Sequence, residues 1–267
     1  MVELIVVSAI IAILAALLLP ALVQAKAAAQ GTACLSNLKQ MQIGWQMYAN
    51  DFSDILAPNA SAAAKLPDTQ EDLNESYAWC STAEEGWGAL DSNTNEVYYT
   101  RSVLAPYLSA QIRVFKCPSD KVPSANGQRL RSYSMNGQMG QYLLSQLGPG
   151  FALNNNPGYK VYNTMNDLTC PGTAMAWIFC DEHAGSIDDG FLTVSMTGGV
   201  WPDVPASYHR WGGGFSFADG HVELRKWASQ QIKIPVTPQV GVHNVAAGLN
   251  NPDYMWFTQR SACLMED

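Results

Sequence analysis

Hydrophobic positions divide the chain into an uninterrupted apolar segment, an amphipathic segment and a long region of short periodic runs. Residues 4–25 contain no charged side chain, with Glu3 directly before them and Lys26 directly after them. As a helix with a rise of about 1.5 Å per residue, this segment spans roughly 33 Å, enough to cross the hydrocarbon core of a bilayer. Residues 1–26 are therefore expected to form a membrane or filament-core segment.

Two simple interpretations of this segment leave residues unexplained. A cleaved signal peptide is compatible with the small residues that follow, but such peptides begin with basic residues, whereas this chain carries Glu3. A plain membrane anchor explains the length of the segment. It does not explain the acid at the start or Pro20 near the far end.

The helical pattern continues beyond the apolar segment. Apolar residues recur at offsets of 4, 7, 11 and 14 along one helix face, which suits packing against a sheet. This face consists of Cys34, Leu38, Met41, Trp45 and Tyr48. Asn50, Asp51 and the later Pro58 predict the end of a helix about 50 residues, or roughly 75 Å, long. Pro20 and Gly31 are expected to weaken this helix by local melting.

Beyond this helix the chain is rich in Gly, Pro, Asn, Ser and aromatic residues, and its short periodic runs predict an α+β fold. Strands are expected at residues 113–117, 131–135, 174–180 and 190–194, with a hairpin at 215–218 and 221–226. Helices are expected near residues 97–108 and 252–260. The prediction is a long N-terminal helix, residues 1–52, packed on the mainly antiparallel sheet of a globular domain with long loops, residues 53–267.

The placement of Glu3 and Pro20 around the apolar run closely resembles the N-terminus of type IV pilins and type II secretion pseudopilins. In that family a leader ending in Gly precedes the mature chain, and the acid lies two residues further in than Glu3 does here. The resemblance covers residues 1–25 and implies that Glu3 directs assembly by pairing with the terminal amine of a neighbouring subunit. It also implies a helical homo-oligomer, held in the inner membrane before pilus or secretion machinery assembles it into a cell-surface filament.

A second resemblance lies further along the chain. His209 is followed by nine residues and then by Asp219 and Gly220, which resembles the H-X9-DG element of large pilin-like proteins abundant in Planctomycetes, Verrucomicrobia and Lentisphaerae. Other segments resemble the same group: residues 34–40 (CLSNLKQ), 47–51 (MYAND), 115–120 (FKCPSD) and 181–190 (DEHAGSIDDG). Together they imply a secreted filament or pseudopilus subunit.

Charge and cysteine content narrow the classes of partner and compartment. A net charge of −8 without a basic stripe argues against a nucleic-acid partner. An even number of cysteines in an exported protein predicts at least one disulfide, with Cys34 and Cys117 as the first candidate pair, although several also fit the role of small buried residues. Without CxxC pairs, their spacing argues against a structural zinc site. The cysteines are Cys34, Cys80, Cys117, Cys170, Cys180 and Cys263.

The H-X9-DG element has a structural interpretation. Asp219 and Gly220 lie between two alternating segments and predict a two-residue type I′ hairpin turn. His209 is expected to hydrogen-bond into that hairpin, with metal ligation as the alternative. The three glycines at 212–214 lack the lysine and the following helix of a phosphate-binding loop.

Four carboxylates are the best candidates for chemistry. Clustered acids in a glycine-containing loop suit Ca²⁺, and some pseudopilins carry calcium in a C-terminal loop; the alternative is a hydrogen-bonded loop with solvated carboxylates. The candidate ligands are Asp181, Glu182, Asp188 and Asp189. No further cofactor is expected, and without a recognisable hydrolase or protease motif we expect no enzymatic activity.

The expected function is that of a structural subunit of an extracellular or periplasmic pilus-like or pseudopilus filament, assembled through its N-terminal apolar helix. The alternative is a membrane-anchored minor pseudopilin, or a glycan- or peptide-binding module of a secretion system. The 8 Trp and 11 Tyr residues provide aromatic surface for such binding.

Overall fold

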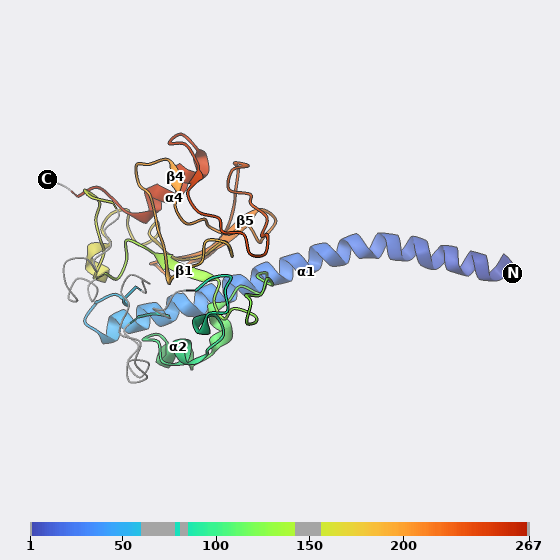
Figure 1. Ribbon diagram of the computed structural model, residues 1–267, viewed down its shortest axis with the longest axis horizontal. Coiled ribbons are helices and arrows are strands. Elements are labelled where there is room, and N and C mark those ends of the chain that lie inside the picture. Colours follow the sequence, from blue (N-terminus) through green and yellow to red (C-terminus); the bar gives the residue numbers. More distant parts are fainter. Residues whose placement is uncertain (1, 60–77, 81–84, 142–155, 266–267) are drawn as a thin grey trace.

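The computed structural model describes residues 2–59, 78–80, 85–141 and 156–265. The longest element, helix α1, projects from the globular part over its N-terminal half, whereas its C-terminal half lies beside the sheet (Figure 1). The elements are α1 Val2–Asp51, η2 Asp91–Asn93, α2 Val97–Thr100, η3 Ala105–Leu108, η4 Ile112–Phe115, β1 Tyr133–Asn136, η5 Met165–Asp167, β2 Trp177–Asp181, β3 Phe191–Leu192, β4 Val200–Trp201, β5 Gly212–Phe217, β6 Val222–Lys226, β7 Val245–Ala246 and α4 Pro252–Ser261.

Helix α1 carries the predicted packing face. Its five apolar residues at helical spacing, from Cys34 to Tyr48, are all 7% exposed or less, which confirms the prediction. The expected melting at Pro20 and Gly31 is wrong, because α1 is continuous through both residues. Pro20 removes only one backbone donor. Gly31 is a packing position instead: a Cβ atom there would lie 3.1 Å from Leu224 Cδ1 of β6.

The central sheet has five strands in the order β3-β1-β2-β5-β6. Strand β1 pairs in parallel with β3, and the other neighbours pair antiparallel. A long helix packed on a mixed, mostly antiparallel sheet confirms the α+β prediction. A second, two-stranded sheet pairs β4 with β7.

The central sheet is covered on both faces. The amphipathic half of α1 joins one apolar cluster with Trp79, Phe115 and Phe179, in which the Trp79 ring contacts both phenylalanine rings. Helix α4 covers the other face, where Phe257 packs against Trp177 at a ring-centroid distance of 4.8 Å. The domain is therefore layered, with α1 as a structural part of its core.

One glycine of β5, Gly214, allows α1 to lie directly on the sheet. A Cβ atom at Gly214 would lie 2.7 Å from Leu38 Cδ1 and 3.1 Å from Cys34 Sγ. Such distances leave no space for a side chain. Gly214 therefore serves close packing between a helix and a strand, whereas a Cβ atom at Gly212 would meet the Arg225 carbonyl of β6.

Several predicted elements are confirmed and others are wrong. The sheet contains the strands expected at 131–135, 174–180 and 190–194 as β1, β2 and β3, the hairpin as β5 and β6, and the helix at 252–260 as α4. The segment predicted as a strand at 113–117 instead overlaps the 3₁₀ helix η4, which ends at Phe115. The helix expected at 97–108 is divided into α2 and η3, and Pro106 lies in the first turn of η3, where its missing N–H leaves no helical hydrogen bond unmade. Strands β4 and β7 were not predicted.

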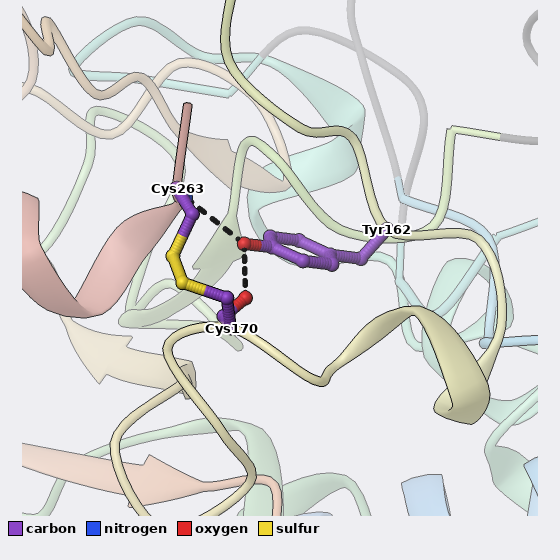
Figure 2. The surroundings of a disulfide bond; sticks show 3 residues. All are labelled: Tyr162, Cys170 and Cys263. Atoms are coloured by element: carbon purple, nitrogen blue, oxygen red, sulfur yellow. Dashed lines mark hydrogen bonds between the residues drawn. A yellow bond between two sulfur atoms is a disulfide. The ribbon is translucent and has the colours of Figure 1, made fainter. Parts of the chain in front are cut away.

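One disulfide joins Cys170 to Cys263, 93 residues apart. It ties the segment after η5 to the chain end after α4. Tyr162 lies beside it, and its hydroxyl donates to the Cys170 carbonyl and accepts from the Cys263 N–H (Figure 2). The expected disulfide is therefore present, but the first candidate pair was wrong: Cys34 and Cys117 remain thiols.

Candidate metal centre

Four metal-ligating side chains from distant parts of the chain converge beneath helix α1. Their donor atoms all lie within 4.8 Å of one another, and each residue is at most 5% exposed. One comes from α1, one follows η4, one ends β2, and one precedes β5. We call these residues the buried donor cluster: Cys34, Cys117, Asp181 and His209.

The contacts within the buried donor cluster are short. His209 Nε2 lies 3.1 Å from Asp181 Oδ2 and 3.3 Å from Cys117 Sγ. The Cys34 thiol lies 3.3 Å from the same Asp181 oxygen. The donor atoms therefore face a common centre.

Local backbone structure fixes the positions of two of the donors, Cys117 and His209. Cys117 is held where its N–H donates to Ser132 Oγ at 2.7 Å. His209 precedes two residues in the left-handed region, Arg210 and Trp211, at φ values of 54° and 65°. This turn lets the His209 N–H donate to the Gly212 carbonyl at 2.9 Å, at the start of β5.

Burial and neighbouring groups shift the pKa values within the buried donor cluster. Burial raises the pKa of Cys34 well above its ordinary value. Burial alone would also raise the pKa of Cys117, but hydrogen bonds with Cys34 and His209 outweigh it, and the pKa is lowered. Burial opposes a charged His209, yet its hydrogen bonds with Asp181 and Cys117 raise its pKa to about 10.

The buried donor cluster does not have the geometry of a nucleophilic triad. In a triad, the nucleophile and the carboxylate bind opposite nitrogens of the histidine ring. Here Cys117 and Asp181 both contact Nε2 of His209. The other nitrogen, Nδ1, is buried without a hydrogen-bond partner in the described part of the chain.

The four carboxylates proposed for calcium are divided between the two faces of β2. Asp181 faces α1, whereas Glu182 points to the opposite face and binds Ser134 and Ser186. Burial raises the pKa values of Glu182, Asp188 and Asp189. The negative charge of Asp203 raises the pKa values of all three acids further. These acids therefore share one negative environment away from Asp181.

Asp188 lies in a second group of possible ligands. Its carboxylate lies within 4.8 Å of those of Asp203 and of the His243 ring. Asp188 and His243 are exposed, and the pKa of His243 is raised, first by its hydrogen bond with Asp203. The calcium site was predicted with Asp181, Glu182, Asp188 and Asp189. Asp181 lies apart from the other three, beside Cys34 and His209, and calcium bound by the remaining three stays a prediction. A rise in melting temperature when calcium is added to chelator-treated protein, lost in Asp188→Asn, would support it, and an unchanged melting curve would contradict it.

The H-X9-DG element attaches the β5–β6 hairpin to α1. The predicted type I′ turn is wrong: only Gly220 has a positive φ, 97°, so the loop has three residues and Asp219 stays at negative φ. Lys39 of α1 donates to the Gly220 carbonyl at 2.6 Å, and Gln46 donates to the carbonyl of Ala218 at 2.8 Å. The His209 side chain contacts Asp181 rather than the turn. Its backbone bonds into the hairpin as expected, because its N–H donates to the Gly212 carbonyl and its carbonyl accepts from Lys226.

The members of the buried donor cluster were not expected to form one site. Cys34 and Cys117 were disulfide candidates, Asp181 was a candidate calcium ligand, and His209 was expected to bond into a hairpin, with metal ligation as the alternative. The available signal was that each of four segments resembling the same pilin-like group contributes one ligand-type side chain. Glu3 and Pro20, the assembly candidates, lie on the projecting part of α1. Comparison with protein-family models, curated proteins and solved structures gives no match.

Proposed function

The projecting half of α1 exposes an apolar surface that water does not support. Thirteen large aliphatic side chains between Leu4 and Val23 are 51–77% exposed. Burial of one such side chain contributes about 1.5–3 kcal/mol, so covering all of them is worth tens of kcal/mol. Among the described residues, α1 is also the one helix long and apolar enough to cross a membrane. This half therefore requires lipid or other helices around it.

We propose that the protein is a structural subunit of a pilus-like or pseudopilus filament. The observation that carries the proposal is the division of α1 into an apolar half outside the domain and an amphipathic half inside it. A helix that is apolar all round fits lipid and fits the centre of a helical bundle equally well. The subunit is held in the inner membrane by the first half and then transfers it into the filament core.

The residues around the point where α1 leaves the globular domain support the proposed stage in which the subunit is held in the membrane. Arg210 donates to the carbonyl of Gln24 at 3.4 Å, close to exposed Lys26, where the apolar segment ends. The neighbouring Trp211 is 49% exposed. Tryptophan and basic side chains are favoured at the membrane–water interface. These residues would place the globular domain against the lipid headgroups.

Photo-cross-linking in cells that contain pilus or secretion assembly machinery tests the proposal. A photoreactive residue at Leu14 should link subunits into ladders in a sheared, filament-containing fraction, which negative-stain microscopy would show as filaments. The matched control is Gln230, exposed on the globular domain, where we expect far fewer links. Links from Leu14 to lipid alone in every fraction would indicate a membrane-anchored module and overturn the proposal.

A further inference from the structure

The buried donor cluster has the composition of a zinc site. Zinc is bound in proteins by thiolates, imidazole nitrogens and carboxylates, with four ligands in structural sites. The cluster offers two sulfurs, one nitrogen and one oxygen from four residues. The absence of CxxC pairs argued against zinc at the level of sequence. That argument applies to ligands close in sequence, whereas here the fold brings together four separate segments.

The spacing of the donor atoms fits tetrahedral coordination. With bond lengths of about 2.3 Å to sulfur and about 2.0 Å to nitrogen or oxygen, tetrahedral ligand atoms lie about 3.3–3.8 Å apart. The contacts are 3.1 Å from His209 to Asp181, 3.3 Å from His209 to Cys117 and 3.3 Å from Cys34 to Asp181. A small outward movement of each side chain would accommodate the ion.

Hydrogen-bond donors surround the cluster in the manner of a metal site's outer shell. The Tyr133 hydroxyl lies 3.3 Å from Cys34 Sγ, and the Ser119 N–H donates to Cys117 Sγ at 3.4 Å. The Gly214 N–H donates to Asp181 Oδ2 at 2.8 Å. Donors aimed at thiolate and carboxylate ligands orient them and stabilise their negative charge. Each of these contacts is made to an atom that would bind the metal.

The balance of charge in the buried donor cluster also favours a bound cation. In the described part of the chain, the ion-pair partner of Asp181 is His209 alone, and neither thiol contacts a Lys or Arg side chain. Buried anions require compensation by a cation or by hydrogen bonds. Binding of Zn²⁺ would release to solvent the protons held by the two thiols and by the His209 imidazole. The resulting site, with two thiolates, one carboxylate and one neutral imidazole, has a net charge of −1, which the three outer donors offset.

We propose that Cys34, Cys117, Asp181 and His209 bind one structural Zn²⁺ that fastens helix α1 to the sheet. Four protein ligands without an open position, and without exposure to solvent, fit a structural rather than a catalytic ion. The ligands connect α1, the segment after η4, the end of β2 and the start of β5. The ion therefore holds the filament spine to its globular domain. This inference is independent of whether the subunit polymerises.

Metal analysis of the full chain, purified in detergent without a polyhistidine tag, tests the proposal. We expect about one zinc per chain by mass spectrometry. Replacement by cobalt should give the visible absorption of a tetrahedral ion, together with near-ultraviolet thiolate-to-metal charge transfer. Zinc removal by a chelator should lower the melting temperature, and zinc addition should restore it.

Matched variants locate the ion. Cys34→Ser and His209→Gln should lower the zinc content at least about tenfold. Cys180→Ser, one residue from Asp181 on the opposite face of β2, should retain it. If a ligand variant fails to fold, the zinc content and the cobalt spectrum of the unaltered protein show whether the protein binds a tetrahedral metal ion through thiolates. Metal-free protein whose melting is insensitive to zinc, or peptide mapping that finds a Cys34–Cys117 disulfide, would overturn the proposal.

Discussion

The two halves of helix α1 share one conformation but differ in their surroundings. Between Leu4 and Val23 the large apolar side chains lie outside the domain, whereas from Cys34 to Tyr48 the apolar face is buried against the sheet. The first half is apolar on all sides, and the second on one side only. The distribution of apolar residues around a helix therefore determines whether its partner is the same chain or an external environment.

This difference separates two kinds of substitution effect. Changes in the buried half should alter folding of the globular domain, because its core includes that face. Changes in the projecting half should leave the domain folded and alter membrane retention or assembly.

The largest effect is expected for Trp45→Ala. Trp45 is fully buried in the main apolar cluster, and removal of a buried tryptophan typically costs about 3–5 kcal/mol. For a domain of this size, that loss lowers the melting temperature by roughly 10 °C. Leu17→Ala, at a site 70% exposed in the projecting half, should leave the melting temperature within about 1 °C.

Thermal unfolding of both variants, followed by tryptophan fluorescence in the same detergent, measures this contrast. Leu17→Ala should still reduce the fraction of protein recovered in sheared filaments. Equal melting shifts in the two variants would show that the projecting half also contributes to the fold of the domain.

A smaller effect, on assembly alone, is expected for Glu3→Ala. An acid forced into apolar surroundings costs about 2.5–3.5 kcal/mol unless it has a partner. Lys26 lies about 35 Å away along the same helix and cannot reach it. The resemblance to pilins implies that the terminal amine of a neighbouring subunit neutralises Glu3 and sets the axial register.

Glu3→Ala should therefore keep the melting temperature and membrane insertion of the unaltered protein but sharply reduce filament yield. Ser8→Ala is the matched control, since among the described residues the Ser8 hydroxyl bonds within its own helix, to the Ile5 carbonyl. Sheared-fraction yields, compared with total membrane-bound protein, give the measurement. Normal yield from Glu3→Ala would mean that apolar packing alone drives assembly.

Sequence patterns predicted the elements that repeat a period over many residues. The packing face of α1 and the β5–β6 hairpin were recognised because their buried positions recur at helical or strand spacing. Strands β4 and β7 were missed because two residues are too few to show a period. Residues 113–117 contain the strand-favouring residues Val114 and Phe115 but do not alternate over several positions, and η4 covers Ile112–Phe115 instead of a strand.

The site could be predicted less well than the fold. Cys34 was recognised as a buried helix residue, and His209 and Asp181 within separate motifs, but their distances depend on how α1 lies on β5. That packing depends on Gly214, whose missing side chain leaves room for Cys34 and Leu38. Periodicity reports which face is buried. It does not report which segments meet there.

The smallest effect is expected at the boundary between the two halves, for Gly31→Ala. Alanine is favoured over glycine within a helix by about 1 kcal/mol. Its Cβ would lie 3.1 Å from Leu224 Cδ1, a contact that the half-buried Leu224 side chain can relieve by moving. Gain and cost should nearly cancel, so we expect a change in unfolding free energy within about 1 kcal/mol.

Gly214→Ala provides the contrast, because its Cβ would lie 2.7 Å from Leu38 Cδ1 and 3.1 Å from both Cys34 Sγ and Asp181 Oδ2. Overpacking of this kind costs about 1–3 kcal/mol, and the crowded side chains here are buried and cannot move into solvent. Melting curves of the two variants, recorded under the same conditions, would compare the loss of stability that alanine causes at each glycine position. A loss of stability at Gly31 as large as that at Gly214 would mean that the tight contact between helix and sheet already begins at residue 31. The projecting half of α1 would then be held at a fixed angle to the domain from that residue onward.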